Sequence, residues 1–231
     1  HFTGGKSKLS INPKNFSMKD GILKDVFAIG ISASLANILV SVSSMVVNGQ
    51  LSGIANGELL VAGYGVTSKV TMIITLIGIG IGAGVQPIVG FLYGAKNKER
   101  LLGTIRFSVI FGLGFCLALS VIAFILAGPI VKIFLTEPEA YDAAIKFTRI
   151  LLSTGWLIGA FVVFQNALQA MGAATPALLA SLFRQGIIFI PTVFIMKALM
   201  GVMGIILAQP VADVLSLLVI TVMTGQKLKK I

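Results

Sequence analysis

Long uncharged apolar runs limit what this chain can fold into. A helix needs roughly 20 apolar residues to cross a hydrocarbon layer about 30 Å thick, and runs of this kind recur along the 231 residues. Only 11% of the residues are charged, against roughly 25% in a soluble domain. This composition excludes an ordinary cytosolic enzyme. It favours membrane-spanning helices, because a helix satisfies its own backbone hydrogen bonds in lipid.

The apolar runs predict an all-α fold, a polytopic membrane protein with a bundle of six transmembrane helices. We expect this bundle to occupy residues 26–226, between basic tails at residues 1–25 and 227–231. The fourth and fifth spans are separated at residues 172–176, because Gly after one helix and Pro at the start of the next are typical helix boundaries. The predicted spans cover approximately residues 26–48, 59–93, 107–131, 150–171, 176–196 and 202–224.

Basic side chains gather at one end of this predicted bundle. Six spans put both termini on the same side of a membrane. Twelve Lys and Arg lie on that side, in the two tails and in the loop between the second and third spans, whereas four lie on the other side. Since cytoplasmic loops carry the excess of Lys and Arg, both termini are predicted to be cytoplasmic. The expected location is a cell membrane, namely a bacterial inner membrane.

Polar side chains form a continuous stripe on each of the first two spans. They recur at steps of three and four residues, which places them on one helix face. Lipid offers no partner to hydroxyl and amide groups, so these faces are expected to meet protein or water. We interpret them as the lining of a solute path, with helix–helix contact as the alternative. The residues are Ser34, Asn37, Ser41, Ser44 and Asn48 in the first span and Tyr64, Ser68, Thr71, Thr75, Gly78, Gly82 and Gln86 in the second.

Span four adds three amides near its cytoplasmic end, those of Gln165, Asn166 and Gln169. Polar groups inside a membrane tend to be functional. We therefore expect these amides to line the same path, and the alternative is that they bond neighbouring helices.

Three charged residues fall inside the predicted spans, namely Lys69, Arg184 and Asp213. An isolated charge at the membrane centre costs at least about 2.5 kcal/mol, and Arg184 and Asp213 lie at similar predicted depths. We expect these two to form an ion pair, with a proton or cation role for Asp213 as the alternative. Lys69 lies one residue off the stripe of span two, where it could contact a neighbouring helix, contact the solute or extend outward.

Residue types that enzyme and metal chemistry require are scarce. Cys116 is the only cysteine and lies in an apolar run, and His1 is the only histidine. We therefore expect no catalytic residue, no metal site and no cofactor. The spaced glycines of residues 78–84 lack the strand and the lysine of a phosphate-binding loop. Because the membrane topology explains the basic charge, no nucleic-acid partner is expected.

Four segments resemble parts of the multidrug and toxic compound extrusion (MATE) transporters. Residues 84–95 (GVQPIVGFLYGA) are similar to the end of that family's eighth helix, and residues 62–66 (AGYGV) are similar to its start. Arg184-Gln185-Gly186 followed by Pro191 resembles the eleventh helix. Residues 209–213 (QPVAD) resemble the twelfth helix. The matches keep the family's order along most of residues 26–224.

This resemblance implies one six-helix lobe, the carboxy-terminal half of a twelve-helix antiporter. Its partner would be the amino-terminal MATE lobe of the same parent chain, with the solute path between the two lobes and spans one, two and four at the cleft. The implied activity is export of small organic, often cationic, compounds in exchange for Na⁺ or H⁺. Many relatives carry a carboxylate in the helices that match spans one and four. Because neither residues 26–47 nor span four holds one, the coupling-ion site is expected in the other lobe.

Other readings remain open beside this one. A lipid-linked saccharide flippase has a similar multi-helix plan, and a membrane assembly subunit that transports nothing would share the apolar composition. A second copy of the chain could also replace the partner lobe, because a parallel repeat can be built from two identical chains.

Overall fold

The computed structural model describes residues 22–229, and this part of the chain is helical without any strand. Most of the two predicted basic tails lies outside the described residues. The helices are α1 (Ile22–Ser52), α2 (Gly57–Gly94), α3 (Lys98–Ile125), α4 (Ala127–Phe134), α5 (Pro138–Gly155), α6 (Leu157–Ala170), α7 (Ala174–Leu182), α8 (Phe189–Met200) and α9 (Val202–Lys229), with a π-helix, η2 (Phe183–Ile187), between α7 and α8.

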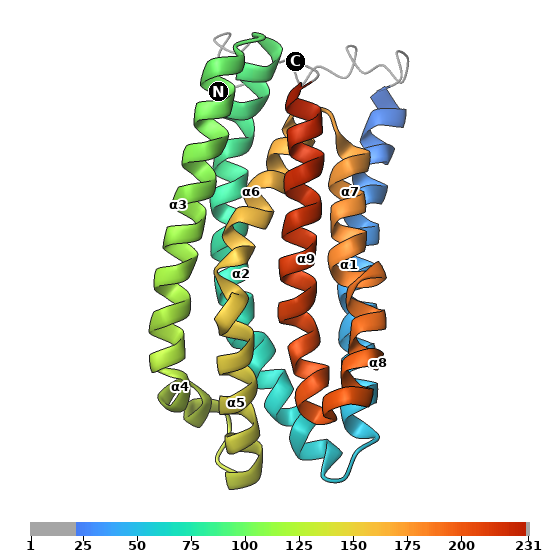
Figure 1. Ribbon diagram of the computed structural model, residues 1–231, viewed down its shortest axis with the longest axis vertical. Coiled ribbons are helices and arrows are strands. Elements are labelled where there is room, and N and C mark those ends of the chain that lie inside the picture. The colour runs from blue at the N-terminus through green and yellow to red at the C-terminus, as the bar shows by residue number, and fades with distance from the viewer. Residues whose placement is uncertain (1–21, 230–231) are drawn as a thin grey trace, which may run out of the picture.

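The long helices run side by side along one axis (Figure 1). Helix α1 begins and α9 ends at the same end of the bundle, beside the α2–α3 connection; we call this the terminal end. The opposite end, which holds the α1–α2 connection and α4, is called the far end. Five helical segments of the described chain are long and apolar enough to cross a membrane, and the bent pair α5–α6 makes a sixth span.

Helix α3 and the third predicted span have different bounds. The span was placed at residues 107–131, whereas the structure has α3 at Lys98–Ile125 and a separate short helix, α4, after it. The side chain of Asn97 accepts a hydrogen bond from the backbone N–H of Arg100 (3.2 Å), so the helix begins in the charged loop, well before the apolar run. Apolar composition marks the part of a helix that lies in lipid, whereas capping marks where the helix starts.

The fourth and fifth predicted spans are interrupted rather than regular. Helices α5 and α6 meet at Trp156 with a bend of 48°, and α5 already begins at Pro138, well before the predicted start at residue 150. Between α7 and α8, the N–H of Ile188 donates to the carbonyl of Phe183 (3.0 Å), five residues back, which is the π-helical pattern. Pro191 follows within a turn and cannot donate to Ile187.

Helix α2 lies at the centre of the lobe and packs along both α5 and α6. Its buried side includes Gly63, Thr67 and Ile74. Helices α3 and α6 cross at Gly112 and Gly159, where a Cβ atom on Gly159 would overlap the carbonyl oxygen of Gly112. Small residues allow this close approach of two backbones, as expected for helices that associate in lipid.

Candidate functional site

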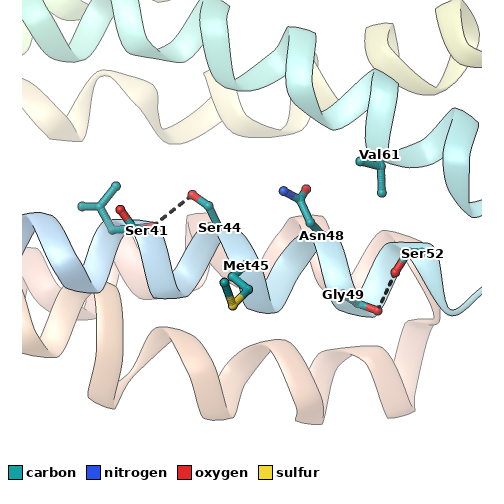
Figure 2. Close-up of a pocket in the computed structure, with 8 residues that line it drawn as sticks. Ser41, Ser44, Met45, Asn48, Gly49, Ser52 and Val61 are labelled. Carbon is teal, nitrogen blue, oxygen red and sulfur yellow. Dashed lines mark hydrogen bonds between the residues drawn. The ribbon is translucent and has the colours of Figure 1, made fainter.

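The polar stripe of α1 lies on the surface of the lobe. Ser34, Asn37, Ser41 and Ser44 are exposed and Asn48 is half-buried. Ser41, Ser44 and Asn48 face an open groove of about 680 Å³ between α1 and the start of α2. Figure 2 shows these three side chains pointing toward α2, with Val61 on the opposite wall. The groove is completed by Val40, Met45, Gly49 and Ser52.

Three serine hydroxyl protons on the wall of this groove are already used within α1. Ser41 donates to the carbonyl of Asn37 (3.3 Å), Ser44 to that of Val40 (3.0 Å) and Ser52 to that of Gly49 (3.2 Å). A serine hydroxyl has one proton and two lone pairs, so each of these oxygens keeps acceptor capacity. The serines therefore make the α1 wall richer in acceptors than in donors.

The stripe of α2 is half-buried and uses its donors in the same way. Ser68 donates to the carbonyl of Tyr64 (2.9 Å), Thr71 to that of Thr67 (3.1 Å) and Thr75 to that of Thr71 (3.0 Å). Gln86 is also half-buried. These residues lie beside the buried face of α2 and present a partly accessible polar edge.

Two glycines in line with this stripe serve helix packing, as expected for small residues spaced four apart. Gly78 and Gly82 are buried, and Cβ atoms at these positions would meet the side chains of Ile158 and Asn166 on α6. Steps of three and four residues keep these positions on one face of the helix, but they do not show where a neighbouring helix covers that face. Helix α6 covers it at Gly78 and Gly82.

The three amides of span four separate into two kinds. Gln165 donates to the hydroxyl of Ser181 on α7 (2.7 Å), and Asn166 donates to the carbonyl of Val162 (2.9 Å). Gln165 thus bonds a neighbouring helix, whereas Asn166 bonds its own helix. Gln169 is exposed near the terminal end of α6.

Arg184 and Asp213 meet inside the lobe. The Nε of Arg184 lies 2.8 Å from Oδ1 of Asp213, and their side chains are 13% and 5% exposed. The same carboxylate oxygen accepts from Nε2 of Gln209 (3.0 Å). The guanidinium carbon lies 5.0 Å from the centroid of the Phe161 ring, within cation–π range. The contact has the form that the predicted ion pair requires, and it joins η2 to α9.

Lys69 does not belong with the buried charges. Lys69 is exposed. The one ion pair within the described residues is that between Arg184 and Asp213. Lys69 is two residues from the buried Thr67, about 200° around the helix, so it points away from α5 and α6. The position of Lys69 within a predicted span does not show this orientation, because a residue in the middle of a long helix can lie on the exposed face.

Two contacts that fasten the lobe were not predicted from the sequence. Thr67 and Thr148 are both fully buried, with their Oγ1 atoms 3.0 Å apart, and they join α2 to α5. The hydroxyl of Ser43 donates to the backbone carbonyl of Gln185 and joins α1 to η2. Gly63, Thr67 and Ile74 recur at helical spacing, and this pattern could have predicted the buried face that holds Thr67. No pattern in the residues around Ser43 predicts its contact.

Comparisons with known proteins agree with this architecture. The sequence model of the MatE family matches residues 32–195. The chain is 28% identical over 214 residues to the multidrug export protein MepA of Staphylococcus haemolyticus (strain JCSC1435), covering 92% of this chain and 46% of that protein. MepA of Staphylococcus aureus (strain MSSA476) is 30% identical with the same coverage. The chain thus spans about half the length of the curated relatives it matches.

Solved structures show the same fold at low sequence identity. A crystal structure of MATE in complex with MaL6 has a TM-score of 0.90 at 20% identity, covering 99% of this chain and 52% of the other. An outward-facing multidrug resistance MATE family transporter has a TM-score of 0.90 at 19% identity, covering 99% and 51%. These likenesses confirm the predicted all-α membrane bundle.

Proposed function

The chain belongs to the MATE family, and on this premise we propose that it forms one six-helix lobe of a multidrug efflux antiporter. The relatives named above are multidrug export proteins about twice its matched length. In the proposed transporter a second lobe faces this one, either the amino-terminal lobe of the same parent chain or a second copy. The two lobes rock between inward-open and outward-open states around the solute path.

The orientation we propose places the terminal end in the cytoplasm. Lys96, Lys98 and Arg100 follow α2 at this end, and Lys227 and Lys229 close α9 beside them. Lys and Arg are enriched in cytoplasmic loops, which supports this orientation. The far end, with the α1–α2 connection, then faces the outside of the cell.

The observation that carries the proposal is the exposed polar groove of α1. The lone pairs of Ser41 and Ser44 and the amide of Asn48 would meet hydrocarbon if this face were turned to lipid, and lipid offers them no partner. A facing lobe would convert the open groove into a path between the lobes. Since the serine protons are used within α1, acceptor oxygens face this path and favour solutes that carry N–H donors or positive charge.

We propose that the coupling ion, Na⁺ or H⁺, binds outside this lobe. Among the described residues, Asp213 is the buried carboxylate, and its Oδ1 already accepts from Arg184 and Gln209. The amides of α6 bring no titratable group. A carboxylate on the facing lobe is therefore the better candidate for exchanging an ion.

Gradient-driven efflux of a fluorescent organic cation from membrane vesicles tests this function. Separate imposed Na⁺ and pH gradients should identify the coupling ion, and Ser44→Leu should slow efflux several-fold without lowering the amount of protein in the membrane. Thr221→Leu is the matched control, because Thr221 is exposed and donates to its own helix (Leu217 carbonyl, 2.7 Å), but it lies outside the groove. Equal effects of the two variants, or no efflux under either gradient, would contradict the proposal.

A further inference from the structure

A second, smaller crevice lies between α3 and α5, away from the α1 groove. Its volume is about 160 Å³, below the roughly 300 Å³ at which drug-sized sites begin. Two aromatic rings and three aliphatic side chains form most of its wall. The lining residues are Leu117, Ser120, Val121, Phe124, Leu152, Ser153 and Trp156.

Ser120 lines this crevice, but its hydroxyl oxygen is enclosed between α3 and α5, close to Gly155. The residue is 2% exposed, and its hydroxyl has no hydrogen-bond partner. The other polar groups of the lining are used, since Ser153 donates to the carbonyl of Ile150 (2.6 Å) and the Trp156 indole donates to that of Ser153 (3.0 Å). An unsatisfied buried hydroxyl costs roughly 1–3 kcal/mol, but this oxygen has almost no surface open to a ligand, so the apolar wall and the charge at its rim decide what the crevice can bind.

A cationic side chain stands at the rim of the crevice on the side of the far end. Arg149 is exposed, and its guanidinium carbon lies 5.4 Å from the centroid of the Phe124 ring. Arg149, Ser153 and Trp156 follow one another at steps of four and three residues along one face of α5. Lys146 extends this face by one turn toward the far end, where Asp142 begins it.

The order of groups along this face matches the order of groups in a membrane phospholipid. The headgroup layer adds about 5–8 Å on each side of the hydrocarbon core, and Arg149 stands about 10 Å along the axis from Trp156. A phosphate at Arg149 would therefore bring the first part of an acyl chain along Leu117 and Val121, both of which are exposed.

We propose that this crevice binds an anionic phosphoglyceride from the leaflet that surrounds the far end. Arg149 receives the phosphate, and Trp156 and Phe124 contact the chain. Lys146 adds a second positive charge, which favours a lipid of net negative charge over a zwitterionic one. The site is independent of the solute path and of which membrane face the far end occupies.

The single tryptophan of the chain makes a direct test possible. Trp156 is the only tryptophan within residues 1–231, and any outside them is replaced by phenylalanine in the full transporter. The protein is reconstituted in phosphatidylcholine vesicles with a minor fraction of phosphatidylglycerol, and one of the two lipids carries brominated chains that quench tryptophan fluorescence on contact. Per mole of lipid, brominated phosphatidylglycerol should quench Trp156 about five-fold more strongly than brominated phosphatidylcholine.

Two variants decide whether the preference arises at this site. Arg149→Gln should remove most of the preference, whereas Arg106→Gln, which removes an exposed charge at the terminal end of α3, should leave it unchanged. High salt should also reduce the preference of the unsubstituted protein, and this measurement decides the matter if Arg149→Gln does not fold. Equal quenching by the two lipids, or a preference that survives Arg149→Gln, would overturn the proposal and leave the crevice to water or bulk lipid.

Discussion

Replacing either Arg184 or Asp213 alone should destabilise the protein more than replacing both residues together. Removing one partner of a buried pair costs roughly 3–5 kcal/mol. Arg184→Gln should lower the free energy of unfolding by about 3 kcal/mol, at the low end of this range, because Asp213 keeps its hydrogen bond from Gln209 (3.0 Å). Asp213→Asn should cost a similar amount, since the Phe161 ring offsets only part of the charge left on Arg184.

The double variant Arg184→Gln with Asp213→Asn should lose less than either single variant. It buries no uncompensated charge, and only about 1 kcal/mol of hydrogen bonding is at stake. Unfolding in mixed micelles, monitored by the circular dichroism of the helices, measures the change in the free energy of unfolding for the three variants. We expect a coupling of several kcal/mol between the two residues. Losses that simply add would refute the pairing argument. If Asp213→Asn abolished gradient-driven efflux at unchanged stability, Asp213 would instead have a proton or cation role.

Three further predictions use the same unfolding assay or the folded yield. Gly159→Ala should lower the folded yield sharply, because the new Cβ meets the backbone of α3, whereas Gly114→Ala, with open space around it, should not. Thr67→Val should cost about 1–2 kcal/mol by leaving the buried hydroxyl of Thr148 with one partner fewer, and adding Thr148→Val should cost little more. Lys69→Gln should change stability by less than about 0.5 kcal/mol, since its side chain is exposed; a loss as large as that of the ion-pair variants would show that Lys69 is buried.

The helical conformation of each span could be predicted from the sequence, because the lipid environment imposes it on each segment separately. In lipid a backbone must bond within its own segment, so an apolar run of sufficient length specifies a helix wherever it packs. Helix ends and breaks depend on more than hydropathy. Asn97 begins α3 in the charged loop, and the bend at Trp156 and the π-helical turn at Arg184 lie inside apolar stretches.

The candidate site was predictable only in part. A continuous polar stripe on α1 and an expected partner for each buried charge both follow from the cost of polarity in lipid. The roles of the individual positions did not follow. Gln165 bonds Ser181, Asn166 bonds its own helix, and Lys69 points outward.

The sequence by itself determined the chemistry of each helix: how many apolar segments there are, where they change into polar loops, and which faces are polar. These properties depend on the order of residues and on their transfer from water to lipid. Only the tertiary structure decided which polar face stays open and which is sealed. That outcome depends on how closely neighbouring backbones approach, as at Gly112 and Gly159, and on contacts between residues far apart in the chain, as between Ser43 and Gln185. Helical periodicity gives the angle of a side chain around its own axis, but it does not give the neighbour at that angle.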